Sequence, residues 1–282
     1  MIANCLDHFV IITPDIAKAV QQYETLLGRD VDWQHISTTD GTATAIFRLA
    51  NTAVELMAPH GSGPVGDRIL EILDGREGAL TSLAFGSPNI DDSHYYAYRR
   101  GLQPDQIVRQ AADYMGQPRQ WARFRCNDAA LGDVKLFVVQ QESGAMAYMG
   151  ALKGSASRLD HVVINTTNPD RALATYGARL NLDLALDRTN EKWGARFLFM
   201  RTDDTTIEII QRLDGKPARD EADKLWGVTY EVSDLDVAHQ RLSDARVEVT
   251  DVRKGRKAGT RVMRVQSHCL GIPTLLLDTN GE

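Results

Sequence analysis

The chain has 282 residues, enough for one large domain or two of ordinary size. Hydrophobic residues make up 43% and charged residues 25%, which excludes bulk disorder. With 32 Lys and Arg against 38 Asp and Glu, the net charge is −6, which argues against a nucleic-acid partner. We expect no membrane span and no signal peptide, because no apolar run has the required length or flanks. The three cysteines lie far apart and lack the spacing of a disulfide framework or a cysteine zinc site, so we expect a cytoplasmic protein.

Two segments of the chain repeat each other. The tripeptides Leu6-Asp7-His8 and Leu159-Asp160-His161 open two apolar runs that lie 153 residues apart. The match continues without a gap for about fifty residues, which indicates that a folding unit has been duplicated. The residues that it aligns include Ala19 with Ala172, Tyr23 with Tyr176, Leu27 with Leu180, Gly41 with Gly194, Arg48 with Arg201, and Glu55 with Glu208.

The first copy predicts a strand, a helix and three further strands. The apolar run 6–13 is the first strand. The pattern at 15–28 predicts a helix, with Asp15 as its N-cap and Gly28 as its C-terminal stop. Turn signals then separate three strand candidates, at 30–37, 42–49 and 53–57.

Two weaker copies of this β-α-β-β-β unit follow the strong ones. Each has an apolar strand that leads into a helix and a closing strand; the segments are 81–85, 91–100 and 134–139 in one copy, and 227–232, 236–245 and 274–277 in the other. The four modules lie near residues 5–58, 79–140, 158–211 and 225–278. We predict an α+β fold with two tandem half-barrel domains, residues 1–142 and 158–282, joined by a linker at 143–157.

Four modules of this kind resemble the vicinal oxygen chelate superfamily, which includes glyoxalase I, extradiol dioxygenases and bleomycin resistance proteins. The resemblance rests on the two Leu-Asp-His openings and on endings such as Val54-Glu55-Leu56, and it covers nearly the whole chain. The first half is similar to the glyoxalase-like domain subgroup. The resemblance implies that two modules pair into an open half-barrel. A His on the first strand of a module and a Glu on its last strand would then point into one cup.

The candidate metal ligands are His8 with Glu55 and His161 with Glu208. Each His precedes its Glu by 47 residues. Imidazole nitrogen and carboxylate oxygen suit Fe, Mn, Ni, Co or Zn, and such a metal would activate an oxygen-bearing substrate. Glu55 and Glu208 are also candidate catalytic groups, because without a metal the pairs could act as acids and bases. The structural alternative is that both histidines are core residues bonded to the backbone.

The other two modules lack matching ligands. Ser82 and Gly227 stand at the His positions, and Lys135 and Thr274 stand at the Glu positions. This departure disfavours a standard extradiol dioxygenase. The Lys135 ammonium would repel a metal, so we consider it a candidate for an ion pair with Glu55 or for catalytic proton transfer.

Three residues are candidates for substrate binding. Arg48 and Arg201 each precede a paired Glu by seven residues and could bind a carboxylate or phosphate in the cup. An outward, surface position is the alternative for both. Tyr230 could line an apolar pocket, although aromatic residues on strands are more often part of the core.

These observations predict a metal-dependent lyase, isomerase or dioxygenase that acts on a small oxygenated organic or aromatic compound. The alternative is a metal-free protein of the same fold that binds a small molecule without converting it. We expect the small molecule to be the partner, with neither nucleic acid nor membrane involved. A homodimer is one assembly open to the chain.

Overall fold

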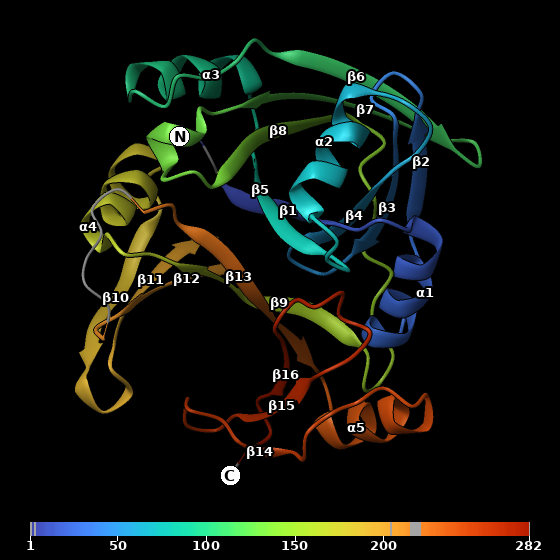
Figure 1. The fold of residues 1–282 in the computed structure, drawn as a ribbon, viewed down its shortest axis with the longest axis vertical. Helices are drawn as coiled ribbons and strands as arrows, with labels where there is room; N and C mark the ends of the chain where they lie inside the picture. Colours follow the sequence, from blue (N-terminus) through green and yellow to red (C-terminus); the bar gives the residue numbers. More distant parts are fainter. Residues whose placement is uncertain (1, 3, 204, 215–220, 282) are drawn as a thin grey trace. The chain divides into compact units, whose positions relative to one another are not determined.

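The computed structural model describes the whole chain except residues 1, 3, 204, 215–220 and 282. Its described part contains two eight-stranded mixed sheets and few helices, which confirms the predicted α+β fold (Figure 1). The helices are α1 (Ile16–Leu27), α2 (Pro64–Leu73), α3 (Ile90–Arg99), α4 (Pro169–Ala172) and α5 (Leu235–Asp244). None of the helices in these described residues has the length and apolar character needed to cross a bilayer.

The first sheet contains the strands of the first two modules. They are β1 (Cys5–Ile12), β2 (Trp33–Ser37), β3 (Thr42–Arg48), β4 (Ala53–Pro59), β5 (Ala79–Gly86), β6 (Val108–Tyr114), β7 (Gln117–Arg125) and β8 (Lys135–Ser143). Their order across the sheet is β2-β3-β4-β1-β5-β8-β7-β6. The first and last strands of each module are therefore neighbours, as the resemblance implied.

The second sheet repeats this arrangement with the strands of the other two modules. They are β9 (Ala156–Asn165), β10 (Asp183–Asn190), β11 (Ala195–Thr202), β12 (Thr205–Arg212), β13 (Lys224–Val232), β14 (Arg253–Lys254), β15 (Arg261–Val265) and β16 (Thr274–Asp278). The order is β10-β11-β12-β9-β13-β16-β15-β14, so the two sheets have the same topology. The duplication seen in the sequence is thus a duplication of fold.

Helix α1 begins and ends where the sequence predicted. The Asp15 side chain accepts a hydrogen bond from the backbone N–H of Lys18 at 3.1 Å, which satisfies one of the free donors at the helix start. Gly28 has a φ of 69°, a conformation that favours glycine, and its N–H donates to the carbonyl of Glu24. The equivalent helix of the third module differs, because α4 continues into a wider π-helical turn at Leu173–Arg179.

The described chain divides into two compact units. The first unit comprises residues 1–9, 81–145 and 161–226, and the second comprises 10–80, 146–160 and 227–282. Each unit draws on both sheets, so these units differ from the tandem domains expected from the sequence. The predicted domain limits therefore stay a prediction.

An arginine connects helix α5 to other segments of the second unit. Arg241 on α5 donates hydrogen bonds to the carbonyls of Thr25, Leu26 and Gly154, the last two at 3.0 and 3.3 Å. The last carbonyls of a helix have no partner within the helix, so the guanidinium caps α1.

Arginines play the same part in the first unit. Arg171 forms an ion pair with the buried carboxylate of Asp223 at 2.6 Å, and Arg179 donates to the carbonyl of Ala130 at 2.9 Å. Burial raises the pKa of Asp223, although the hydrogen bond from Arg171 acts in the opposite direction. The hydrogen bond from Arg179 thus links the second and third modules within this unit.

Candidate functional site

The third module brings the repeated histidine and glutamate together. Strands β9 and β12 are parallel neighbours, with Thr206 opposite His161 and Glu208 opposite Val163. His161 Nε2 lies 3.2 Å from Glu208 Oε2, and the two side chains are 18% and 14% exposed. The sequence-predicted contact is therefore present in this module, between two partly exposed side chains.

The strand register extends this face toward the sheet edge. In one row, Arg201 lies opposite Thr206 and so shares a row with His161. In the next row, Leu186 lies opposite Phe199, which lies opposite Glu208. Directly opposed residues point to the same side of a sheet. We call six residues from these two rows the third-module face: His161, Leu186, Phe199, Arg201, Thr206 and Glu208.

The third-module face combines a histidine–glutamate pair, an arginine cation and apolar surface. A carboxylate beside an imidazole orients the ring and stabilises its protonated form. Arg201 is exposed two strands away, at a Cα separation from His161 of about 10 Å. Asp183 lies opposite Arg201 at the outer strand. A small molecule lying on Phe199 could therefore meet the cation at one end and the imidazole at the other.

The histidine of the first module contacts the aspartate that precedes it. His8 Nδ1 lies 2.7 Å from Asp7 Oδ1, within the first unit. The Asp7 carboxylate also accepts a hydrogen bond from the Gln141 side chain at 3.4 Å. Glu55 belongs to the second unit, where it is half-buried on β4 opposite Ile46. The sequence analysis did not consider the neighbouring Asp7 as a contact of His8.

A helix fills part of the sheet face in the first module. Helix α2, inserted after β4, contributes Ile69 and Leu73 to a buried apolar cluster with Val10, Ile12 and Ala79 (Figure 1). Val10 and Ile12 alternate with the neighbouring residues of β1, so they lie on one face of that strand. The insertion is thus a packed core element of its module.

The residues present do not fit a resident metal. His161 and Glu208 supply two donors, whereas zinc sites in proteins use at least three protein ligands. Within the described ranges, no group of three His, Cys, Asp or Glu side chains is placed to hold a metal ion. Thr274 lies opposite Val228, and its hydroxyl donates to the carbonyl of Ile272 at 2.8 Å. The predicted ligand set therefore stays incomplete in the third module.

The remaining predicted site residues are partly or fully buried. Lys135 is half-buried on β8 opposite Ser82. Arg48 is half-buried on β3, and its backbone N–H donates to Asp32 at 2.7 Å. Tyr230 is fully buried in the second unit, where burial raises the pKa of its phenol. The roles expected for these three residues stay predictions.

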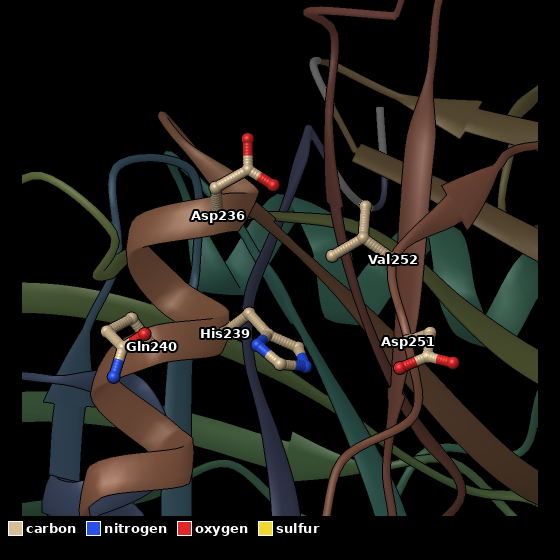
Figure 2. Close-up of a pocket in the computed structure, with 5 residues that line it drawn as sticks. All are labelled: Asp236, His239, Gln240, Asp251 and Val252. Atoms are coloured by element: carbon tan, nitrogen blue, oxygen red, sulfur yellow. The ribbon is translucent and has the colours of Figure 1, made fainter.

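A hollow of about 350 Å³ lies between α5 and the segment before β14 (Figure 2). Its lining includes Asp236, His239 and Asp251, none of which the sequence analysis selected. The spacing of Asp236 and His239, three residues apart on one helix, was the only available signal. Asp236 already binds Arg261 at 2.7 Å, so the hollow does not offer a free cluster of acidic groups.

Two family descriptions match the sequence. Residues 6–153 match the description "Glyoxalase-like domain", and residues 160–263 match "Glyoxalase/Bleomycin resistance protein/Dioxygenase superfamily". No curated protein matches the chain. The first of the two matches covers more than half of the chain, so it establishes the family.

Several solved structures have a similar fold. A mutant of 4-hydroxymandelate synthase from Streptomyces coelicolor is 14% identical with a TM-score of 0.71, covering 100% of this chain and 94% of that chain. A xylose isomerase-like TIM barrel/4-hydroxyphenylpyruvate dioxygenase fusion protein is 11% identical with a TM-score of 0.62, covering 98% of this chain and 48% of that chain. A hypothetical protein from Staphylococcus aureus is also 11% identical with a TM-score of 0.62, covering 97% and 98%.

Identities this low show a shared fold and nothing about shared chemistry. The fold agrees with the family match, with the two sheets of identical topology and with the repeated Leu-Asp-His openings. The chain belongs to the glyoxalase-like domain family, within the vicinal oxygen chelate superfamily.

Proposed function

We propose that the chain is a vicinal oxygen chelate enzyme of the isomerase or lyase type, which moves a proton on a small oxygenated carboxylate. The working site would be the third-module face. The observation that carries the proposal is the 3.2 Å contact between His161 and Glu208 on an accessible face. Arg201 supports it, because it supplies a cation in the same row as His161.

The proposed steps follow from these three side chains. Arg201 binds the substrate carboxylate through its planar guanidinium. His161 takes a proton from the carbon next to the substrate carbonyl, and the electron pair of the broken C–H bond moves into an enolate. Glu208 stabilises the imidazolium until the proton is returned to the other face of the carbon or to a neighbouring atom. The substrate is rearranged without oxidation or reduction.

Aromatic oxo and hydroxy acids are the class to test first. Phe199 and Leu186 offer apolar surface beside Glu208, which suits a ring. Two proteins of similar fold carry the names of 4-hydroxymandelate and 4-hydroxyphenylpyruvate, both aromatic acids. The superfamily resemblance also implied a divalent metal. Since His161 and Glu208 lack a third donor among the described residues, no step of this proposal uses a metal.

Hydrogen exchange on 4-hydroxyphenylpyruvate tests the proposal. In D₂O, the protein should speed deuterium uptake at the carbon between the ring and the keto group, measured by proton NMR against buffer. His161→Ala should lower the protein-dependent rate by about 10²-fold or more, since general acid–base groups contribute that much. His8→Ala is the matched control and should change the rate by less than about threefold. Equal losses in the two variants would contradict the proposal.

A second candidate function is metal-free binding without turnover. The incomplete donor set at the third-module face favours it, because a binding protein needs no metal. Calorimetry with the same acid separates the two functions. Saturable binding without faster deuterium uptake would replace the enzyme by a binding protein. A stoichiometric metal that is lost together with activity in His161→Ala would overturn both metal-free proposals.

A further inference from the structure

The second module carries a basic face that the proposed function does not use. Arg119, Trp121, Arg123 and Arg125 alternate along β7, so their side chains point to the same side of the strand. The intervening Phe124 points the other way, toward α3, where its ring contacts His94. Three arginines and one indole therefore share one side of β7, in a protein whose net charge is −6.

Strand β8 adds a fourth cation and a second ring to this side. Phe137 lies opposite Arg125 in the register, so it points to the same face. Lys135 precedes Phe137 by two residues and shares its face. The guanidinium carbon of Arg123 lies 5.4 Å from the centre of the Phe137 ring, a cation–π contact. We call these six residues the second-module face: Arg119, Trp121, Arg123, Arg125, Lys135 and Phe137.

A single glutamine orients the central groups of the second-module face. Gln110 Oε1 accepts hydrogen bonds from Arg123 Nε at 2.8 Å and from Trp121 Nε1 at 3.2 Å. Arg119 is 6% exposed, lies 5.8 Å from the Trp121 ring and donates to Gln141 at 3.2 Å. Side chains held in this way lose little freedom when a ligand binds.

The two arginines at the centre and end of the second-module face, Arg123 and Arg125, have different described partners. Arg125 forms an ion pair with Asp128. Arg123 is half-buried, and its described contacts are with the neutral side chains of Gln110 and Phe137. A half-buried guanidinium beside two rings is therefore available to an anion.

We propose that the second-module face binds a small aromatic carboxylate. Arg123 pairs with the carboxylate, because its fork of N–H donors matches two oxygens. Trp121 and Phe137 contact the ring of the ligand, since both are aromatic and adjoin Arg123. Lys135 adds charge at the neighbouring strand position. This site is separate from the third-module face, so it does not depend on the proposed reaction.

Calorimetry with 4-hydroxybenzoate as the probe tests this site. The full chain carrying Arg201→Gln is the reference, so that binding at the third-module face is weakened. In this reference, Arg123→Gln should weaken binding by at least about tenfold, as expected for a lost charged hydrogen bond. Arg109→Gln is the matched control and should change binding by less than about twofold. Arg109 lies on neighbouring β6 but pairs with Glu142 and Asp91.

Further ligands and variants distinguish the possible outcomes of this binding measurement. Phenol has the same ring without the carboxylate and should bind far more weakly than 4-hydroxybenzoate. Phosphate binding as tight as that of 4-hydroxybenzoate would overturn the aromatic part of the proposal. Unchanged binding in Arg123→Gln would overturn the whole proposal. If Arg123→Gln does not fold by circular dichroism, Trp121→Leu replaces it, with weaker binding expected and unchanged binding as the contradicting result. His161→Ala should leave this binding unchanged.

Discussion

The first and third modules place equivalent residues in the same row across their sheets, yet they bury these rows differently. In the first module the row is Trp33, Ile46 and Glu55; in the third it is Leu186, Phe199 and Glu208. Trp33 is 2% exposed, whereas Leu186 is 46% exposed. The strand register is thus conserved between the copies, while accessibility is not.

The neighbouring row explains part of this difference. Ile12 and Met57 of the first module pack against the apolar cluster that α2 supplies. Their equivalents in the third module, by the same offset of 153 residues, are Asn165 and Ile210, both half-buried. The comparison teaches that a duplicated motif preserves backbone positions, whereas the side chains around it decide whether a ligand can reach it.

The largest expected difference between the first and third modules is in the rate of the proposed reaction. Glu208→Gln should lower the deuterium-uptake rate of 4-hydroxyphenylpyruvate by about 10²-fold, because the neutral amide no longer stabilises the imidazolium. Glu55→Gln, at the equivalent position, should change it by less than about threefold. Rates measured by NMR on both variants check this. A larger loss for Glu55→Gln would assign the chemistry to the first module.

The packed face should matter more for stability than the open one. Ile69→Ala removes a buried side chain of the α2 cluster and should lower the free energy of unfolding by about 2–5 kcal/mol. Leu186→Ala should lower it by about 1 kcal/mol or less, because Leu186 is largely exposed. Urea unfolding of both variants provides the measurement. Similar losses would show that the third-module face is packed as tightly as the first.

Giving the third module the bulkier residue of the first should close its face. Leu186→Trp introduces the side chain that Trp33 provides in the first module. We expect binding of 4-hydroxyphenylpyruvate to weaken by about tenfold, because the larger ring occupies surface beside Phe199. Calorimetry measures the change, with Leu184→Trp as the control on the same strand. A stronger effect of the control would mean that the ligand lies elsewhere.

The smallest effect concerns the exposed hairpin of β10 and β11. The hydrogen bond from Arg196 holds the pKa of Asp187 below its ordinary value. The ion pair therefore stabilises the folded chain above the ordinary pKa of aspartate, and this contribution is lost as the pH falls through the lowered pKa. Asp187→Asn should cost less than about 1 kcal/mol near neutral pH, since the pair is well exposed. Unfolding measured from neutral to acid pH should show the difference shrinking; a growing difference would refute the assignment.

Much of the fold could be predicted from the sequence because the duplication reveals the repeated β-α-β-β-β unit. The offset that joins Leu6 to Leu159 identified the strong copies, and Asp15 and Gly28 marked the ends of α1. The contact between His161 and Glu208 followed from the expectation that the first and last strands of a module are neighbours.

Other features depend on side-chain choices that the sequence pattern does not show. His8 contacts the adjacent Asp7, a contact that the spacing of the repeated histidine and glutamate does not predict. Tyr230 was a candidate for a pocket or for the core, and it is fully buried; position on a strand does not show which face is covered. The basic face of the second module had a sequence signal, since Arg119, Trp121 and Arg123 alternate, but that signal becomes meaningful only once the strand is paired.

The central claim is that His161, and not His8, meets the substrate. Imidazole NMR signals recorded while 4-hydroxyphenylpyruvate is added test this most directly, with assignments from His161→Ala and His8→Ala. If the ligand contacts His161, we expect a saturable shift of the His161 signals, with those of His8 unchanged. A saturable shift confined to His8 would contradict it.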